Sequence, residues 1–335
     1  MRKNKWVVKH NDPAAVRRLM EQTHVSSVLA NLLINRGYND PQAIEEFLYP
    51  DLHNLSSPFE LLNMGAAVEK ILAHVSKQHK IVVYGDYDVD GICASVILYQ
   101  GLLALGGCAE YYVPDRLEEG YGLNMQAVEN IVQSGVALLI TVDCGISASA
   151  EIQKAQDMGL DVIVTDHHQL PPDLPECIIV DPAMNPAEGA WKYLCGAGVA
   201  FKLVQGMFEC YYQEESSLYR MTPYLDLAAL ATVADIVALK GDNRILVKFG
   251  LEEMKRGERA GISALWKVSR NNESAELNTV AVGFNMAPRL NACGRIGDVR
   301  LGLRLLTTDD PVEAEEIAYK LDAENKSRQE IEREI

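Results

Sequence analysis

The sequence predicts an α/β protein with a doubly wound, mainly parallel sheet, an N-terminal helical segment, a helical second half and a long C-terminal connector helix. From about residue 65 to residue 180, short apolar runs alternate with helical patterns, which is the rhythm of βαβ units. The runs are apolar almost throughout, as strands covered on both faces are. Three of them, at 81–84, 138–142 and 162–165, end abruptly in aspartate.

Capping and stop signals define the elements of the first half. Residues 1–60 are predicted to form an N-terminal helical extension, in which Asp40 caps a helix and Pro41 takes its first position. Glycines after several later apolar patterns end the helices of the sheet domain. In order, we expect helices at about 65–76, 92–105, 124–135 and 147–159, and strands at 81–84, 110–113, 137–142, 161–165 and 177–180.

The second half is predicted to be mostly helical, with helices at 196–213, 223–233, 244–255 and 260–269 and a strand at 279–284. Asp310 and Pro311 open a last helix, which reaches residue 335 without a stop signal. Acidic residues crowd its final turn, where the helix dipole favours bases. We therefore expect a main domain over 61–308 and, over 309–335, the start of a connector helix that continues into a further segment.

Composition indicates an ordinary globular protein, with 48% hydrophobic and 23% charged residues among 335. No apolar run approaches the roughly 18 residues of a membrane span, and no signal-peptide core follows the N-terminus, so a cytoplasmic location without a membrane is expected. The seven cysteines lack zinc-ribbon spacing and are predicted to be reduced. The net charge of −16 argues against a general nucleic-acid coat, although residues 285–304 carry four arginines and one aspartate.

Acids and imidazoles follow the three aspartate-ended runs. Because the carboxyl ends of parallel strands share one edge of a sheet, we expect these side chains to converge. Clustered carboxylates repel one another unless a cation lies between them, so a metal site is the preferred interpretation. The residues are Asp86, Asp88 and Asp90 after the first run, Asp143 after the second, and Asp166, His167 and His168 after the third.

Other interpretations compete at each position. An EF-hand is disfavoured because the twelfth position of the first loop is Ile97 and a strand precedes it. Asp143 could be only a turn residue. Asp235 is the lone charge of an apolar stretch and is the candidate fourth acid, with a buried ion pair or a helix cap as the alternative. Asp181 precedes a proline, and its role stays open.

Two further segments contain residues that could bind a ligand. Gly196 and Gly198 begin like a dinucleotide fingerprint, but the sixth position is Phe201 and no strand directly precedes it, so we interpret the glycines as close helix packing. Residues 288–295 combine arginines with an asparagine and a glycine. Arginine matches phosphate oxygens, and a surface loop with incidental arginines is the alternative.

Taken in order, these segments resemble the DHH phosphoesterases, and within that superfamily the bacterial single-strand-specific 5′→3′ exonucleases. The resemblance extends essentially from residue 1 to residue 335. The segments that carry it are 84–91, 116–123, 141–145, 165–168, 194–200, 231–235 and 288–295.

The resemblance implies two divalent metals bridged by Asp143, with His168 facing the scissile phosphate, so Asp143 and His168 are the catalytic candidates. The mixed carboxylate and imidazole set favours Mn²⁺, with Mg²⁺ as the alternative. The implied metal residues are Asp86, Asp88, Asp90, Asp143, His167 and Asp235. The implied residues for a terminal 5′ phosphate or nearby backbone are Arg116, Asn291 and Arg295.

The resemblance further implies release of 5′ mononucleotides from single-stranded DNA, in DNA repair and recombination, with a single-strand-binding protein and a helicase as partners. The alternative enzyme acts on short oligonucleotides or cyclic dinucleotides. A non-catalytic scaffold is disfavoured because every expected ligand is present. The family continues after the connector into a DHHA1 domain and an oligonucleotide-binding fold. We therefore expect intact metal binding in this chain, with weak or absent processive cleavage.

Overall fold

The computed structural model of the chain describes residues 7, 9–114, 120, 122–213, 218–270, 272, 274–296 and 298–334. By their contacts the residues form two units, Met1–Asn54 and Leu55–Ile335. No helix within the described part is long and apolar enough to cross a membrane.

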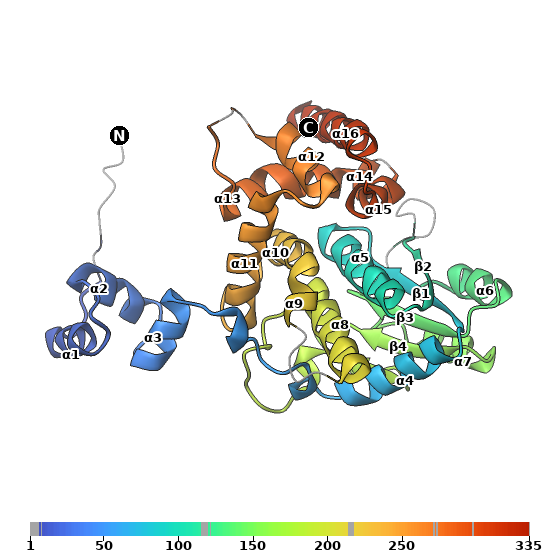
Figure 1. Cartoon of the computed structure of the whole chain (residues 1–335), viewed down its shortest axis with the longest axis horizontal. Helices are drawn as coiled ribbons and strands as arrows, with labels where there is room; N and C mark the ends of the chain where they lie inside the picture. Colours follow the sequence, from blue (N-terminus) through green and yellow to red (C-terminus); the bar gives the residue numbers. More distant parts are fainter. Residues whose placement is uncertain are drawn as a thin grey trace. The chain divides into compact units, whose positions relative to one another are not determined.

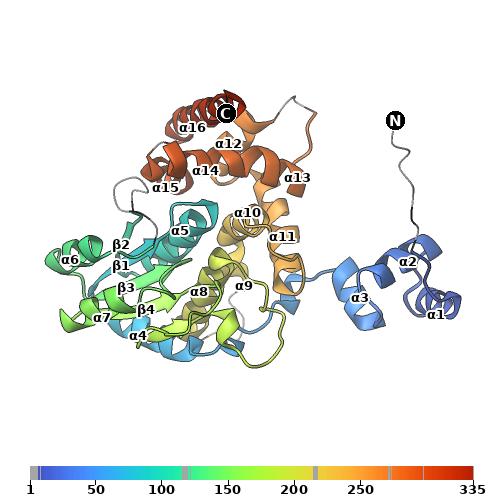
Figure 2. The same ribbon diagram turned by 180° about the vertical axis from the view of Figure 1, so that it is seen from behind.

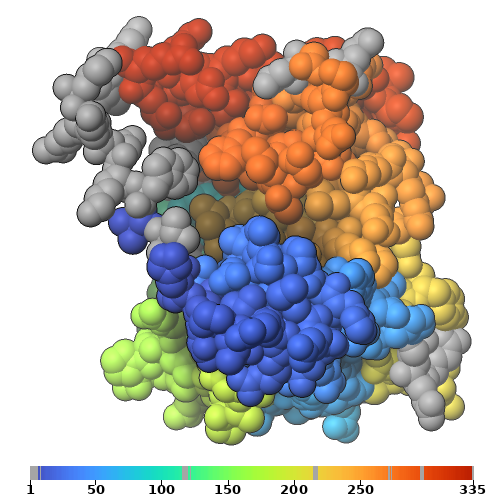
Figure 3. All heavy atoms as spheres, turned by 90° about the vertical axis from the view of Figure 1, so that its left-hand side faces the viewer, coloured from blue at the N-terminus to red at the C-terminus, as the bar shows by residue number. Residues whose placement is uncertain are grey.

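The first unit contains three helices, α1 (Pro13–Thr23), α2 (Ser27–Asn35) and α3 (Pro41–Leu48). Asp40 caps α3 as predicted, with its Oδ2 accepting a hydrogen bond from the N–H of Ala43 at 2.8 Å. The apolar faces of the three helices meet in a small core, and their side chains form one closely packed body (blue in Figure 3). The core residues are Val16, Leu19, Ala30, Leu33 and Ile44.

The second unit is built on a five-stranded sheet in which every neighbouring pair is parallel, as the sequence predicts. The strand order is β2-β1-β3-β4-β5, so the connections change direction between β1 and β3. In open α/β sheets such a switch point is where ligands bind. The strands are β1 (Lys80–Gly85), β2 (Cys108–Tyr112), β3 (Leu138–Val142), β4 (Asp161–Thr165) and β5 (Ile178–Val180).

The register of the three central strands aligns their ends. Gly85 pairs with Val142, and Val142 pairs with Thr165. The next residue in each chain segment is an aspartate, so Asp86 and Asp143 leave the sheet at the same level as the aspartate after β4. The alignment of backbone hydrogen bonds therefore brings the three acidic loops together.

Helices cover both faces of the sheet (Figures 1 and 2). On one face lie α5 (Val89–Ala104) and α8 (Gly196–Tyr212), with α4 (Met64–Ser76) beside α8. On the other face lie α6 (Met125–Gln133) and α7 (Ser149–Asp157), packed on the alternate strand residues. Because α5 is buried along nearly its whole length, it reads as apolar without an amphipathic pattern.

The helices predicted for the second half are present. They are α10 (Leu225–Ala234), α11 (Asp242–Arg256), α12 (Ala260–Ser269) and α16 (Pro311–Glu334), accompanied by α9 (Leu218–Met221), α14 (Ala287–Ile296) and α15 (Val299–Thr307). Single 3₁₀ turns lie at Leu52–Asn54, Pro58–Glu60, Pro182–Met184 and Thr222–Tyr224.

The prediction of a strand at 279–284 is wrong. The segment forms α13 (Thr279–Ala281), followed by a π-helical turn over Val282–Met286. The side chain of Asn278 caps this helix by accepting from the N–H of Ala281 at 3.0 Å, and Val282 and Met286 are buried at helical spacing. Residues 288–295 likewise lie in α14 and do not form a surface loop.

Candidate metal centre

Acidic and imidazole side chains gather at the carboxyl edge of the sheet. Among the described residues, three overlapping groups each offer ligand atoms that lie within 4.8 Å of one another. Two of the groups share Asp143 and two share His167, so the groups form one continuous cluster. The groups are Asp86, Asp88 and Asp143; Asp90, His167 and Asp235; and Asp143, His167 and His168.

His167 is the centre of the cluster. Its Nε2 lies 3.1 Å from Oδ1 of Asp143, 3.6 Å from Oδ2 of Asp90 and 3.8 Å from Oδ2 of Asp235. Burial lowers the pKa of His167, and this effect outweighs the neighbouring Asp90 carboxylate, which raises it. The imidazole is therefore neutral, as a metal ligand must be.

Asp143 carries the strongest sign that the cluster suits a cation. It is 2% exposed, and its φ of +59° is a left-handed conformation that aspartate tolerates. Burial, then the carboxylates of Asp90 and Asp88, raise its pKa well above the usual value. Within the described part of the chain its buried Oδ1 makes no hydrogen bond, although it lies 3.1 Å from Nε2 of His167. A cation between these two atoms satisfies both.

The N-terminus of α8 fixes Asp90. The N–H groups of Gly196 and Ala197 donate to its Oδ2 and Oδ1 at 2.7 and 2.8 Å, and the positive end of the helix dipole favours this negative charge. A Cβ on Gly196 would lie 2.5 Å from the Cβ of Asp143. The glycine interpreted as a packing residue thus also admits Asp143 and helps to anchor Asp90, a role that the sequence analysis missed.

The first carboxylate loop is held from two sides. Asp88 caps α5 by accepting from the N–H groups of Asp90 at 2.8 Å and Gly91 at 3.1 Å. Burial and the charge of Asp90 raise the pKa of Asp88. Asn291, predicted as a phosphate ligand, accepts from the N–H of Val89 at 3.1 Å through its Oδ1. Its carboxamide oxygen therefore positions the loop that carries Asp88 and Asp90.

Asp166, one of the acids expected to converge at the strand ends, contacts the adjacent imidazole and the backbone of its own loop and of the loop after β3. Its Oδ1 lies 2.7 Å from Nδ1 of His168 and accepts from the N–H of His167 at 2.8 Å, while its Oδ2 accepts from the N–H of Ile146 at 3.0 Å. Burial raises the Asp166 pKa, but the His168 hydrogen bond and charge outweigh it, so the net shift is downward.

The same hydrogen bond fixes the charge of His168. It raises the pKa of His168 to about 9 against the opposing effect of burial. In the metal-free protein the imidazole is therefore protonated at neutral pH. Its side chain is 45% exposed, so this charge is accessible from solvent beside the carboxylates.

Asp235 joins the cluster and Asp181 does not. Asp235 ends α10, and burial followed by the charges of Asp90 and Asp88 raises its pKa to about 7. Asp181 is buried after β5, where its Oδ1 accepts from the N–H of Ala183 at 2.7 Å. Burial raises the pKa of Asp181 to about 7, and Asp181 belongs to none of the three ligand groups.

The basic stretch predicted at 285–304 is largely neutralised. Arg289 pairs with Asp322, Arg300 with Asp298 and Arg304 with Glu313. The backbone of Arg295 lies on α14, but its side chain is outside the described part of the structure, as is the whole of Arg116. The predicted phosphate contacts of Arg116 and Arg295 therefore stay predictions.

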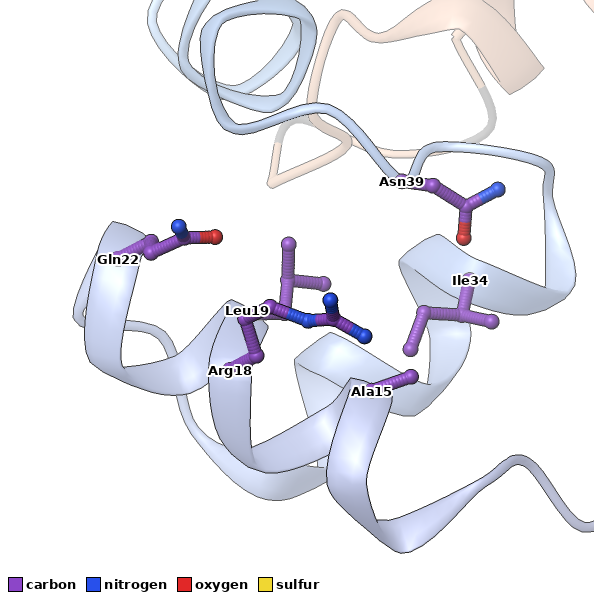
Figure 4. Close-up of a pocket in the computed structure, with 6 residues that line it drawn as sticks. All are labelled: Ala15, Arg18, Leu19, Gln22, Ile34 and Asn39. Atoms are coloured by element: carbon purple, nitrogen blue, oxygen red, sulfur yellow. The ribbon is translucent and has the colours of Figure 1, made fainter.

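A separate cavity lies in the first unit (Figure 4). It has a volume of about 370 Å³ and presents a guanidinium and two carboxamides over an apolar floor. None of the lining residues in the described part of the chain is acidic, so the cavity offers no carboxylate ligand. The lining residues are Ala15, Arg18, Leu19, Gln22, Ile34 and Asn39.

The fold and the cluster together define a class: a doubly wound α/β protein with candidate ligands for divalent cations at its strand ends. The family model described as "DHH family, N-terminal domain" matches residues 80–232. The single-stranded-DNA-specific exonuclease RecJ of Bacillus subtilis (strain 168) is 39% identical over 330 residues, which cover 98% of this chain and 41% of the relative.

Two solved proteins share the fold at substantial identity. An exonuclease RecJ bound to manganese is 37% identical with a TM-score of 0.75, over 82% of this chain and 68% of that chain. RecJ of Thermus thermophilus in complex with Mn²⁺ is 33% identical with a TM-score of 0.83, over 97% of this chain and 46% of that chain. Its Mg²⁺ complex has a TM-score of 0.74 at 30% identity, over 97% and 43%.

The chain belongs to the DHH family, and within it to the RecJ group. It spans less than half the length of the Bacillus relative.

Proposed function

We propose that this chain is the catalytic core of a metal-dependent exonuclease, which removes 5′ mononucleotides from single-stranded DNA. The observation that carries the proposal is the shared position of Asp143 and His167 among three ligand groups at the switch point of the sheet. Relatives with the same fold are single-strand-specific exonucleases and bind Mn²⁺ or Mg²⁺. Because the chain spans 41% of the Bacillus relative, the activity of the whole protein is part of the proposal.

Two cations fit the donor set. Asp86, Asp88 and Asp143 offer carboxylate oxygens to one, and Asp90, His167 and Asp235 offer two carboxylates and an imidazole to the other. The mixed set suits Mn²⁺, with Mg²⁺ as the alternative. When bound, such cations supply Lewis acidity and a water of lowered pKa.

The chain's own residues position and complement that chemistry. The N–H groups of α8 hold Asp90, and Asn291 holds the loop between Asp88 and Asp90. Asp166 orients His168 through its Nδ1, so Nε2 is the ring nitrogen that this hydrogen bond does not use. A protonated, half-exposed His168 can then donate to a phosphate oxygen, which is charge stabilisation of the type that phosphoryl transfer requires. Arg116 and Arg295 remain the candidates for the 5′ phosphate.

The test is cleavage of 3′-labelled single and double strands, with and without a 5′ phosphate, in Mn²⁺. The proposal expects a ladder that shortens from the 5′ end on the single strand only. Asp143→Ala should abolish it, whereas Asp161→Asn, at the opposite end of the sheet, should leave it intact. Cleavage by Asp143→Ala at the wild-type rate contradicts the assignment.

A length series of the same strand separates the proposal from the alternative. An enzyme for short oligonucleotides or cyclic dinucleotides loses activity as the strand lengthens, whereas the proposed exonuclease does not. If this chain alone does not cleave, calorimetric titration with Mn²⁺ still tests the metal centre. Absence of Mn²⁺ binding would contradict the proposed metal centre.

A further inference from the structure

Ile236 has a strained, left-handed backbone conformation that no burial of its side chain offsets. It follows Asp235 directly and has a φ of +59°, where a β-branched residue is strained. Its side chain is nevertheless 89% exposed, so burial does not offset the strain. Strained backbone with an exposed apolar side chain beside a candidate metal ligand indicates a contact with something outside the described chain.

Phe284 is a second large apolar side chain that is exposed to solvent. It lies on the π-helical turn Val282–Met286 and is 78% exposed, and Val280, one turn earlier, is 63% exposed. Val282 and Met286 are buried, so packing fixes the register that turns Phe284 outward. Turns of π-helix are rare and occur frequently at functional sites.

The helical run that carries Phe284 contacts the metal centre's surroundings at two points. A Cβ on Gly283 would lie 3.4 Å from Cγ1 of Val233, two residues before Asp235. Further along the run, Asn291 bonds the N–H of Val89 inside the first carboxylate loop. Phe284 therefore belongs to an element that is anchored on both α10 and that loop.

We propose that Ile236 and Phe284 contact the nucleobases of the DNA strand that enters the metal centre. This inference rests on the proposed function. The reacting phosphate binds at the cations, and its own nucleotide brings a flat, apolar base within reach of the neighbouring surface. Stacking on an aromatic ring does not depend on sequence, which suits an enzyme that degrades any strand.

Charge supports a base contact over a purely electrostatic one. The chain has a net charge of −16, and the described arginines between residues 289 and 304 are held in ion pairs with Asp322, Asp298 and Glu313. These three arginines therefore add little to the attraction of the phosphate backbone. Contacts to the bases would add affinity that does not depend on charge.

The experiment compares a natural strand with one that is abasic at its first three 5′ nucleotides. Binding is measured by fluorescence anisotropy in Ca²⁺, and kcat/KM in Mn²⁺. Phe284→Ala should weaken binding of the natural strand about tenfold and that of the abasic strand less than twofold, whereas Phe284→Trp should retain both. Tyr211→Ala is the matched control: it is 51% exposed but lies at the far end of α8, roughly 22 Å from the end that holds Asp90.

Ile236→Asn tests the second contact without a folding defect. Asparagine tolerates the left-handed conformation, so the variant should melt at a higher temperature than wild type and still bind the natural strand several-fold more weakly. A higher melting temperature with unchanged binding overturns the role of Ile236.

The outcomes separate the inference from the proposed function. If wild type neither binds nor cleaves single strands, the proposed function fails. If wild type cleaves and Phe284→Ala weakens both strands equally, or neither, then Phe284 does not touch bases and the inference alone is wrong. Equal weakening of both strands assigns Phe284 to packing against another protein segment.

Discussion

The two edges of the sheet place the same residue types in opposite electrostatic settings. Among the described residues at the carboxyl edge, carboxylates outnumber bases, and the pKa values of Asp143 and Asp235 are raised by burial and by neighbouring acids. At the amino edge, Asp161 stands alone at the start of β4. Nζ of Lys70 lies 2.6 Å from it and Nε2 of His74 lies 3.0 Å from it.

The difference indicates which of the two acid–histidine clusters is suited to bind a cation. Burial opposes ionisation of Asp161, but its hydrogen bonds from Lys70 and His74 outweigh burial and lower its pKa. That carboxylate is satisfied by the protein itself. At the carboxyl edge, by contrast, the buried Oδ1 of Asp143 accepts no hydrogen bond from the described residues, and we expect an added cation to satisfy it. The balance of charge, more than the presence of His and Asp, therefore distinguishes a metal centre from a structural ion-pair cluster.

The largest expected effect is metal-linked stability. At a free Mn²⁺ concentration 100 times its dissociation constant, one site adds about 2.7 kcal/mol to the free energy of unfolding. Urea unfolding with and without Mn²⁺ measures it. Asp143→Asn should lose this increment, whereas Asp161→Asn should keep it. If Mn²⁺ stabilises the two variants equally, then the metal does not bind at the carboxyl edge through Asp143, and the proposed difference between the edges is wrong.

The next effect is a gain in the free energy of unfolding of Asp143→Asn, which is expected in the absence of metal. In EDTA at pH 8, Asp143→Asn should be more stable than wild type by on the order of 1–2 kcal/mol, because the amide removes a buried carboxylate repelled by its neighbours. The folded pKa of Asp143 is raised above the unfolded value, so wild-type stability is lost as pH rises through that interval and the gap should widen with pH. Urea midpoints at pH 6 and pH 8 test this, and a less stable Asp143→Asn contradicts it.

A smaller loss is expected at the amino edge. Asp161→Asn removes the ion pair with Lys70, and because the Asp161 side chain is 46% exposed, that pair is screened by solvent. The free energy of unfolding should fall by about 0.5–1 kcal/mol, with no change in Mn²⁺ affinity by calorimetry. Lys70→Met offers the complementary variant and should give a similar loss, and weakened Mn²⁺ binding in either variant would show that the edges are coupled.

Much of the carboxyl edge could be predicted because its rules are local. An apolar run that ends in aspartate identifies a strand and its end, and parallel register brings Asp86 and Asp143 to one level. Asp235 was found because a lone charge in an apolar stretch needs a partner. These inferences use only neighbouring residues and the geometry of a parallel sheet.

What the sequence did not predict depends on contacts between distant segments. The N–H of Gly196 meets Asp90 across 106 positions, and Asn291 meets Val89 across 202. In the segment 279–284 the larger apolar residues alternate with smaller ones, as in a strand, but Asn278 caps a helix there and the π-helical turn that follows packs against α10. Local pattern cannot decide such cases, because burial is set by elements elsewhere in the chain.

The smallest expected effect is the pH dependence of the amino edge. Burial lowers the pKa of His74 below its usual 6.5, although the Asp161 hydrogen bond and charge raise it in part. The unfolded chain therefore binds the proton more readily, so the stability from neutral His74 is present above pH 6.5 and is lost as pH falls through the folded pKa. Removing Asp161 removes the groups that raise this pKa.

Asp161→Asn should therefore lose more stability than wild type between pH 7.5 and pH 5.5, when unfolding by urea is followed in EDTA. The groups that face His74 are Lys70 on α4, Asp161 on β4 and His79, whose Nδ1 lies 3.2 Å from Nδ1 of His74. His74→Gln removes the titrating group and should flatten the difference between the two proteins. If the difference survives in the His74→Gln background, then its source is another histidine, and His79 is the first to replace.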